Sequence, residues 1–289
     1  TEFTTISKNT FKSCDILKQI TIPPNIKTIE SNAFDGCLLL TTIDLKEVET
    51  ISKEAFANSG LTEVIINNHI KTIGEKVFSN CLNLNKLEYS NHDIKYESNM
   101  FEGSVNFTTI IITGSGSMQT YTDNSKPWQS IIDKITSVEF KEGVTTIGAY
   151  SFEGATSLET IKWGNIETIG SFSFKGCTSL KTIKLVESIK TIQNNAFEDC
   201  TSLEFISFNK IESIGKNAFY GCKSLSTLTI PTTVTSIDDE SFKQTSLKNV
   251  IFYGLEEPSL CSNYTFDDEL KFVAVPIKYT TKEFCNKTT

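Results

Sequence analysis

One phenylalanine position recurs along this chain at nearly constant spacing, and this period limits the possible folds more than any other feature. Within each of two runs the step from one phenylalanine to the next is roughly 22–23 residues, a length typical of repeat units. The runs consist of Phe11, Phe34, Phe56, Phe78 and Phe101, and of Phe152, Phe174, Phe197, Phe219 and Phe242. A fixed period of this length predicts a stack of repeats, because a single unit cannot bury its apolar side alone.

Other apolar positions recur in step with this phenylalanine. An isoleucine stands five residues before it, at Ile6, Ile29, Ile51, Ile73, Ile147, Ile169, Ile192, Ile214 and Ile237. A second aliphatic residue precedes that isoleucine by three, at Ile26, Val48, Ile70, Val144, Ile166, Ile189, Ile211 and Val234. A small residue, usually cysteine, follows the phenylalanine by three. Each period therefore places its apolar residues on a common inner side.

A segment of the form L-x-x-I-x-I follows each small residue and predicts a short parallel strand. Twelve such segments begin at Leu17, Leu40, Leu61, Leu84, Phe107, Ile135, Leu158, Leu180, Leu203, Leu225, Leu247 and Leu270. Neighbouring strands of a sheet lie ~4.8 Å apart. We expect the segment that leads to the next phenylalanine to cross the opposite side of the coil as a turn or a short 3-10 helix.

The complete repeat motif resembles that of a known family. The string I-x-x-I-G-x-x-A-F-x-x-C-x-x-L is nearly intact at 211–225, and it occurs with one or two changes at 166–180 and 189–203. It resembles the BspA-like leucine-rich repeat family of bacterial and protist surface proteins. The resemblance implies an α/β leucine-rich-repeat solenoid of about twelve coils, each of roughly 22–23 residues. It also implies surface exposure and adhesion to host or neighbouring-cell proteins.

The repeat breaks once in the middle of the chain. The distance from Phe101 to Phe152 is 51 residues, two periods plus about six, so one phenylalanine of the series is missing. Residues 113–134 are rich in Gly, Ser, Thr and Asn, which is typical of a loop. One interpretation is a protruding binding loop. The other is a structural splice in which Trp128 packs in place of the missing phenylalanine, and a similar segment separates repeat blocks in the family that the chain resembles.

These observations predict one continuous solenoid in four parts. They are an N-terminal repeat block (1–112), an irregular loop or degenerate coil (113–134), a C-terminal repeat block (135–255) and a C-terminal cap (256–289). The chain starts in the middle of a repeat, so we expect further sequence before Thr1 in the natural protein.

Six of the eight cysteines occupy the small-residue position of the repeat, at Cys14, Cys37, Cys81, Cys177, Cys200 and Cys222. Other coils have Ser59, Ser104, Ala155 and Thr245 at that position, so it requires a small side chain rather than a thiol. We therefore expect buried free thiols, which pack as small hydrophobes. Cys261 and Cys285 lie outside the series and are candidates for a disulfide that closes the cap.

The sequence contains no motif typical of catalysis, cofactor binding or metal binding. The two histidines, His69 and His92, accompany no nucleophile motif, and no phosphate-binding, dinucleotide or metal-ligand signature occurs. We therefore expect no enzyme activity, no cofactor and no metal. The formal net charge of −8 argues against nucleic acid as a partner. The apolar runs are too short to span a bilayer, so direct membrane insertion is not expected. The oligomeric state stays open.

Strand alternation points the third and fifth residues of each L-x-x-I-x-I segment away from the core. Apolar residues are unexpected at these positions, and four occur there: Ile65, Ile111, Phe205 and Phe272. We predict a partner-binding patch formed by Thr160, Lys162, Thr182, Lys184, Phe205 and Ser207. The alternative is that Phe272 lies under the cap and that Phe205 is an isolated exposed residue.

The sequence thus favours a cell-surface or secreted adhesion module that binds an extracellular or host protein through its strand face. A self-associating structural surface protein is the alternative. A carbohydrate-binding module is a weaker alternative, because sugars stack on exposed aromatic rings. Trp163 is the tryptophan expected on a strand, and it falls at an inward position.

Overall fold

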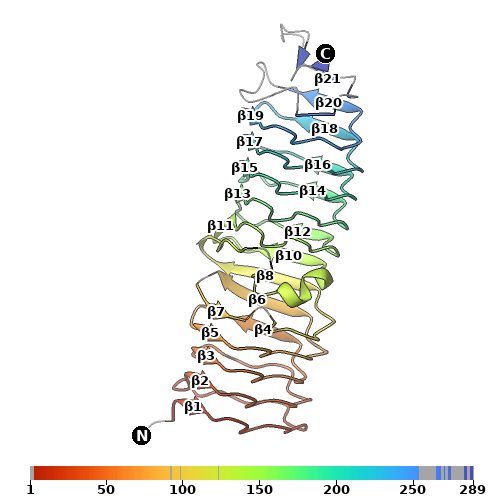
Figure 1. Ribbon diagram of the computed structural model, residues 1–289. Helices are drawn as coiled ribbons and strands as arrows, with labels where there is room; N and C mark the ends of the chain where they lie inside the picture. The colour runs from red at the N-terminus through yellow and green to blue at the C-terminus, as the bar shows by residue number, and fades with distance from the viewer. Residues whose placement is uncertain are drawn as a thin grey trace. The chain divides into compact units, whose positions relative to one another are not determined.

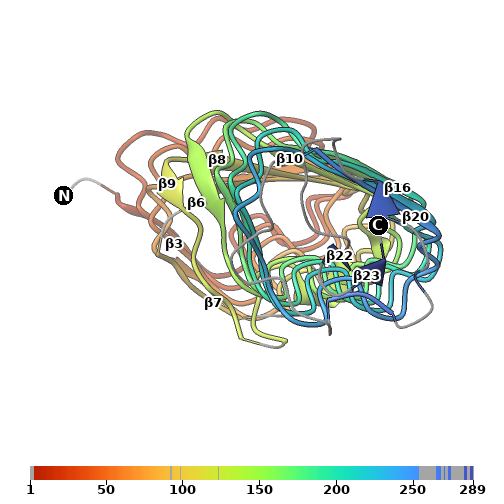
Figure 2. The same ribbon diagram turned by 90° about the horizontal axis from the view of Figure 1, so that it is seen from above.

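The computed structural model describes residues 3–91, 93–97, 99–122, 124–253, 265–267 and 270, and the main chain of 273–274, 283–284 and 287–288. The chain divides into two compact units, each a stack of parallel-strand coils (Figure 1). The N-terminal unit comprises Thr1–Ser115 and Thr122–Lys141. The C-terminal unit comprises Gly116–Tyr121 and Glu142–Thr289. Within each unit, successive coils follow one another as closed loops when viewed along the stack (Figure 2).

The N-terminal unit has a parallel sheet on each of two sides of its coils. One sheet has two-residue strands in the order β1 (Thr5–Ile6), β2 (Thr28–Ile29), β3 (Thr50–Ile51), β5 (Thr72–Ile73) and β7 (Lys95–Tyr96). The other sheet contains β4 (Glu63–Ile66), β6 (Lys86–Asn91), β8 (Thr109–Gly114) and β10 (Ser137–Phe140). Because equivalent residues pair between coils, each repeat position forms a row along the stack.

The C-terminal unit repeats this arrangement. Its first sheet contains β9 (Gly116–Ser117), β11 (Val144–Ile147), β13 (Thr168–Ile169), β15 (Thr191–Ile192), β17 (Ser213–Ile214) and β19 (Ser236–Ile237). The L-x-x-I-x-I side has β12 (Thr160–Lys162), β14 (Thr182–Lys184), β16 (Phe205–Ser207), β18 (Thr227–Ile230), β20 (Asn249–Phe252) and β21 (Val273–Ala274). Near the C-terminus, β22 (Glu283–Phe284) and β23 (Lys287–Thr288) pair antiparallel.

The architecture confirms a parallel-strand solenoid, of about 11 turns. Two details differ from the sequence-based expectation. The second side of the coils has the expected turns but also two-residue strands, and among the described residues helix is confined to η1 (Gln129–Lys134), so the α/β label overstates the helix content. The segments that begin at Leu17 and Leu40 form no strand.

The L-x-x-I-x-I side loses strand pairing next to coils that differ in length. Most coils have the same length from the first residue of this segment to the isoleucine of the other side, but those starting at Leu40, Leu158 and Leu203 are one residue shorter. The Leu40 segment pairs with neither of its described neighbours. Strand pairing is also absent between β12 and β14 and between β16 and β18. A short coil need not lose the pairing on both sides, because β16, on the short coil that begins at Leu203, still pairs with β14 over three residues.

Stacked phenylalanine rings form the centre of both cores. In the N-terminal unit the rings from Phe11 to Phe101 stack with centroid distances of 5.0 to 5.7 Å. In the C-terminal unit the stack runs from Phe152 to Phe242. It continues to Phe266, 5.4 Å from Phe242, a residue outside the series recognised in the sequence.

The small-residue position has a bonding role beyond its size. The thiol of Cys200 donates a hydrogen bond of 3.3 Å to the carbonyl oxygen of Phe174 in the preceding coil. Cys37, Cys81, Cys177 and Cys222 donate in the same way to the phenylalanine one coil earlier. Ser104 makes the equivalent bond with its hydroxyl group, at 2.8 Å. The position therefore favours a small side chain that can donate a hydrogen bond. All six repeat cysteines are free thiols, five of them buried.

Left-handed residues flank the phenylalanines of the series, at φ values between 53° and 78°. Two residues before them stand Asn9, Asn32, Glu54, Lys76, Tyr150, Phe172, Asn195, Asn217 and Glu240. Two residues after them stand Ser13, Gly36, Asn58, Asn80, Gly103, Gly154, Gly176, Asp199, Gly221 and Gln244. Gly and Asn adopt this conformation most readily, which explains their recurrence at these turns.

The irregular middle segment is largely packed rather than protruding. Trp128 is fully buried and contacts Tyr89 edge-on, with ring centroids 5.5 Å apart. Met118, Tyr121 and Ile131 are also buried. This packing supports the interpretation of 113–134 as a structural splice. The proposed limits of the four sequence regions, 1–112, 113–134, 135–255 and 256–289, stay a prediction.

Candidate binding surface

The strand face of the C-terminal unit contains the patch predicted from the sequence. Strands β14 and β16 pair in parallel, with Thr182 opposite Phe205 and Lys184 opposite Ser207. Four of the six predicted residues therefore lie side by side on one two-stranded sheet. Thr160 and Lys162 lie on β12, one coil earlier, and no strand pairing joins β12 to β14.

Local alternation explains why these side chains face outward. Ile183 and Ile206, at the intervening positions, are almost completely buried against the core. Thr160, Lys162, Thr182 and Lys184 are exposed, Ser207 is half-buried, and 46% of the surface of Phe205 is exposed. A phenylalanine with this exposure cannot be explained by core packing, because the inner face of β16 is already filled by Ile206.

The outward positions of this face carry positive charge without acidic residues. From β12 to β18 the third and fifth positions are Thr160, Lys162, Thr182, Lys184, Phe205, Ser207, Thr227 and Thr229. Among the described residues, Lys184 makes no ion pair. An exposed aromatic ring beside an unpaired ammonium group can bind an apolar surface that carries a carboxylate.

The equivalent face of the N-terminal unit differs in charge. Glu63 and Lys86 form an ion pair of 2.9 Å between β4 and β6, and Lys141 pairs with Glu139 at the end of β10. The ammonium groups of Lys86 and Lys141 are thus both paired with carboxylates. These charged groups are already satisfied within the unit, unlike that of Lys184.

Besides Phe205, three apolar residues were expected to face outward: Ile65, Ile111 and Phe272. Ile65 is 44% exposed, as the alternation predicts, but Ile111 is only 9% exposed, so the expectation that it faces solvent was wrong. Ile111 lies on β8 between Glu88 of β6 and Glu139 of β10, and these longer side chains flank it on both sides. Phe272 lies outside the described residues.

The remaining candidate residues show no assembled chemistry. Trp163 is buried against Phe174, as predicted, so its ring is not available for a sugar. His69 is exposed on a turn, 3.7 Å from Glu47. His92, Cys261 and Cys285 lie outside the described residues. Within the described part of the chain, no three His, Cys, Asp or Glu side chains gather as metal ligands, and no helix there is long and apolar enough to cross a membrane.

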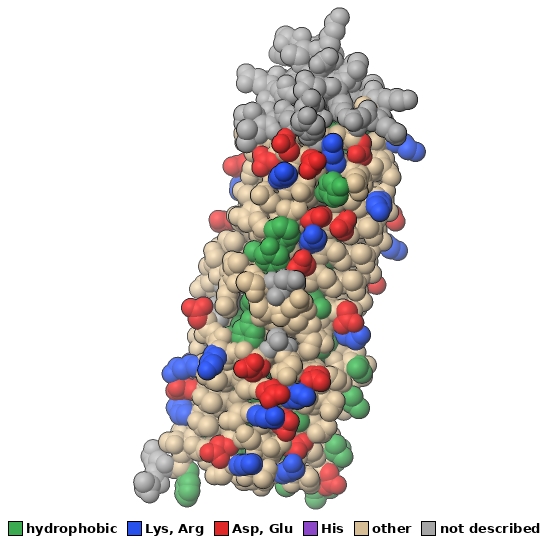
Figure 3. All heavy atoms as spheres, viewed as in Figure 1, with side chains coloured by type: hydrophobic (Ala, Val, Ile, Leu, Met, Phe, Trp, Pro, Cys, Tyr) green, Lys and Arg blue, Asp and Glu red, His purple; other side chains and the backbone are tan. Residues whose placement is uncertain are grey.

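Sequence reasoning missed a row of exposed apolar residues in the N-terminal unit. They occupy the corner, defined here as the two residues between the small-residue position and the L-x-x-I-x-I segment. The exposed apolar residues there are Ile16 (80%), Leu38 (57%), Leu39 (46%), Leu82 (55%) and Val105 (54%). Figure 3 shows hydrophobic side chains spaced along one edge of the lower coils. Tabulating this corner coil by coil would have revealed the row.

Comparison with known proteins agrees with the repeat geometry. The model of the BspA type leucine-rich repeat region matches the chain in six copies, over residues 4–125, 130–248 and 164–272. No protein with a curated description matches the sequence.

Solved structures of leucine-rich repeat proteins are also similar. A leucine-rich repeat protein from Bacteroides ovatus is 22% identical, with 80% of this chain and 77% of that chain covered and a TM-score of 0.34. The pneumococcal vaccine antigen PcpA is 22% identical, with coverages of 92% and 70% and a TM-score of 0.38. A leucine-rich cell surface protein from Faecalibacterium prausnitzii is 22% identical, with coverages of 86% and 76% and a TM-score of 0.32.

The family match extends over most of the chain, and the described coils carry the stacked phenylalanines, the small-residue position and the parallel strands that the repeat motif predicts. The chain therefore belongs to the BspA-type leucine-rich repeat family.

Proposed function

We propose that this protein is a non-enzymatic cell-surface or secreted module that binds a host or neighbouring-cell protein through the strand face of its C-terminal unit. The observation that carries the proposal is the pair of residues Phe205 and Lys184 on adjacent strands. Both are exposed, although neither position requires such a residue for the fold. The surface location follows what membership of the family implies.

The expected partner surface is apolar at its centre and acidic at its edge. Phe205 would supply the apolar anchor, and interfaces concentrate their binding energy in a few such residues. Lys184 would attract a carboxylate, so the association should weaken as salt screens the charges. Thr160, Thr182 and Ser207 would provide hydrogen bonds around the anchor.

Binding to a panel of extracellular matrix and plasma proteins tests the proposal. The double variant Phe205→Ala, Lys184→Ala should weaken saturable binding by at least tenfold, equivalent to about 1.4 kcal/mol. The matched control is Tyr253→Ala, Lys248→Ala, which removes an exposed aromatic ring and an exposed lysine elsewhere in the same unit. Equal loss in both double variants would contradict a site at β14 and β16, and so would no loss in either.

The exposed corner of the N-terminal unit favours a second candidate, a self-associating surface repeat protein. Exposed apolar rows mark association surfaces, and this row has residues on several coils, interrupted by the buried Gly60 between Leu39 and Leu82. Solution mass measured at two concentrations separates the candidates. A mass that rises with concentration and returns to that of the monomer in a Leu38→Thr, Leu82→Thr variant would favour self-association.

A further inference from the structure

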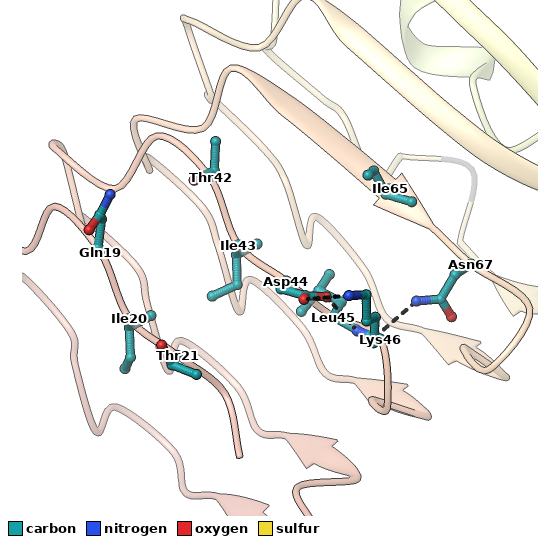
Figure 4. A pocket seen from close by; sticks show the side chains of 10 residues that line it. All are labelled: Gln19, Ile20, Thr21, Thr42, Ile43, Asp44, Leu45, Lys46, Ile65 and Asn67. Carbon is teal, nitrogen blue, oxygen red and sulfur yellow. Dashed lines mark hydrogen bonds and ion pairs between the residues drawn. The ribbon is translucent and has the colours of Figure 1, made fainter. Parts of the chain in front are cut away.

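A cleft lies on the L-x-x-I-x-I side of the first three coils, where the segment that begins at Leu40 forms no strand. Its volume is about 640 Å³. It is lined by Gln19, Ile20, Thr21, Thr42, Ile43, Asp44, Leu45, Lys46, Ile65 and Asn67. Figure 4 shows that these side chains come from three successive passes of the chain, with Ile20 and Ile43 on neighbouring passes.

Unpaired main chain distinguishes this cleft from the rest of the unit. Among the described residues, no main-chain hydrogen bond joins Gln19–Thr21 to Thr42–Leu45, or Thr42–Leu45 to β4. At the ends of the cleft, the amide of Thr62 donates to the oxygen of Thr41, and the side chain of Asn67 donates to the oxygen of Leu45. Between these two bonds the N–H and C=O groups of Thr42 and Ile43 have no partner in the part of the chain that the structure describes.

The missing bonds coincide with a difference in coil length. The coil that begins at Leu40 is one residue shorter than both of its neighbours, counted to the isoleucine of the other side. Its residues nevertheless have the composition of a strand, with the alternation Thr42, Ile43, Asp44 and Leu45. An extended segment with free N–H and C=O groups is a template for pairing with another extended chain.

The side chains of the cleft select the kind of segment that fits. Ile43 and Ile20 are half-buried and Ile65 is 44% exposed, so the cleft offers apolar contacts beside its free main chain. Its two charged residues, Asp44 and Lys46, lie 3.4 Å apart as an ion pair. The lining therefore has no net charge and does not favour a charged guest.

We propose that this cleft binds an uncharged extended peptide segment of a partner protein by strand addition. Main-chain hydrogen bonds to the free groups of Thr42 and Ile43 hold the guest, and alternate apolar side chains of the guest contact Ile20, Ile43 and Ile65. Strand addition of this kind takes its affinity from the main chain and its specificity from alternate side chains. The site is separate from the face of β14 and β16, and it does not depend on the function proposed for that face.

A peptide with the sequence of Leu225–Ile230 (LSTLTI) is a suitable probe, because it is uncharged and is itself a strand segment of this repeat. It carries a fluorophore at one end and two lysines outside the motif for solubility. Two control peptides carry N-methyl groups, one at the residues corresponding to Thr227 and Thr229, the other at those corresponding to Ser226 and Leu228. Each control lacks the N–H donors of one strand edge, and binding is measured by fluorescence anisotropy with the full chain.

We expect saturable binding of the parent peptide and a loss of at least about tenfold for one of the methylated peptides, because two hydrogen bonds are removed. Ile65→Thr should weaken binding by several-fold. Ile251→Thr, at the same repeat position on β20 and 39% exposed, should not. The Phe205→Ala, Lys184→Ala variant should bind the peptide as the unmodified protein does, which separates this site from the proposed function.

Three results would overturn the proposal. Equal binding of the parent and both methylated peptides would show that main-chain pairing has no part in recognition. Absence of saturable binding would show that the cleft does not accept an uncharged strand. A chain that dimerises without peptide, and whose dimer is lost in Ile65→Thr, would identify the occupant as a second copy.

Discussion

The corners of the two units differ although their cores are built alike. Both units stack phenylalanine rings and bond a small residue to the preceding coil. In the N-terminal unit the corner contains the exposed apolar residues Ile16, Leu38, Leu39, Leu82 and Val105, beside the polar residues Asp15, Asn83 and Asn106. In the C-terminal unit the corner residues are Thr156, Ser157, Thr178, Ser179, Thr201, Ser202, Lys223 and Ser224. The same buried rows are thus compatible with an apolar corner or a polar corner, so the corner residues do not determine the fold of the coil.

Polar side chains at the corners donate hydrogen bonds to the preceding coil, which apolar side chains cannot do. Thr178 donates to the carbonyl oxygen of Thr156 one coil earlier, and Ser224 donates to that of Thr201, at 3.3 and 2.8 Å. A leucine cannot make this bond. In the N-terminal unit the polar corner residue Asn106 makes the equivalent bond to the carbonyl oxygen of Leu82, whereas the corner formed by Leu38 and Leu39 has no side chain that can donate one.

The largest expected effect is on the shared inner row. Phe174→Ala in the C-terminal unit and Phe56→Ala in the N-terminal unit should each lower the free energy of unfolding by about 3–5 kcal/mol, because each leaves a large cavity. The fluorescence of the two tryptophans reports the unfolding of the two units separately, since Trp128 lies in the N-terminal unit and Trp163 in the C-terminal unit. Urea unfolding followed in single-tryptophan variants measures each transition. A cost below about 1 kcal/mol in one unit would show that the two cores are not equivalent.

A smaller effect is expected at the small-residue position. Cys200→Ala removes the bond from the thiol to the carbonyl oxygen of Phe174 and should cost about 1–2 kcal/mol. Cys200→Ser should cost less, because Ser104 already makes this bond in the N-terminal unit. Urea midpoints of both variants test the order, and an alanine variant more stable than the serine variant would show that size alone matters.

The buried thiols should also make the free energy of unfolding depend on pH in the alkaline range. Burial, followed by the nearby Cys14, raises the pKa of Cys37 to about 11, whereas the ordinary value is 9.0. The unfolded chain loses this proton first, so stability is full below pH 9.0 and falls as the pH rises to about 11. Burial raises the pKa of Cys81 and Cys222 as well. Cys37→Ser should therefore flatten part of the alkaline decline in the urea midpoint, and an unchanged decline would contradict the assignment.

The smallest effect is expected at the corner itself. Leu82→Thr should change the free energy of unfolding by less than about 0.5 kcal/mol, as for most surface positions. Thr178→Leu should cost about 0.5–1 kcal/mol, because it removes a hydrogen bond. Thermal unfolding of both variants measures the difference. If Leu82→Thr proved the more damaging, the apolar corner would be structural and its link with association would fail.

The sequence predicts the inner rows well, because a burial pattern repeated in every coil has one packing solution. It predicts the outward direction of Phe205 and Lys184 for the same reason. It misplaces Ile111, because the exposure of one side chain depends on the length of its neighbours across the strands. Nor does it show that Phe266 extends the ring stack, since the step from Phe242 to Phe266 is longer than the period of the series.

The strands expected at Leu17 and Leu40 show a different limit. Residue pattern describes one coil, whereas strand pairing requires two neighbouring coils to follow the same path. Counting residues between the two sides of each coil identifies the short coil at Leu40, and this signal was present in the sequence. The candidate patch was found in the same way as the core, by alternation, but the cleft lies where alternation and coil length disagree.

The bonds between coils also govern how this protein would respond to mechanical load. Each coil contacts mainly the next, and bonds such as that from Cys200 to Phe174 follow one another along the stack. A force applied to the two ends would peel the coils one at a time instead of breaking all of these bonds together. Each released coil would add a full repeat of extended chain, about 75 Å. A protein tethered in flow would thus lengthen in steps, dissipating force while its remaining coils stay folded.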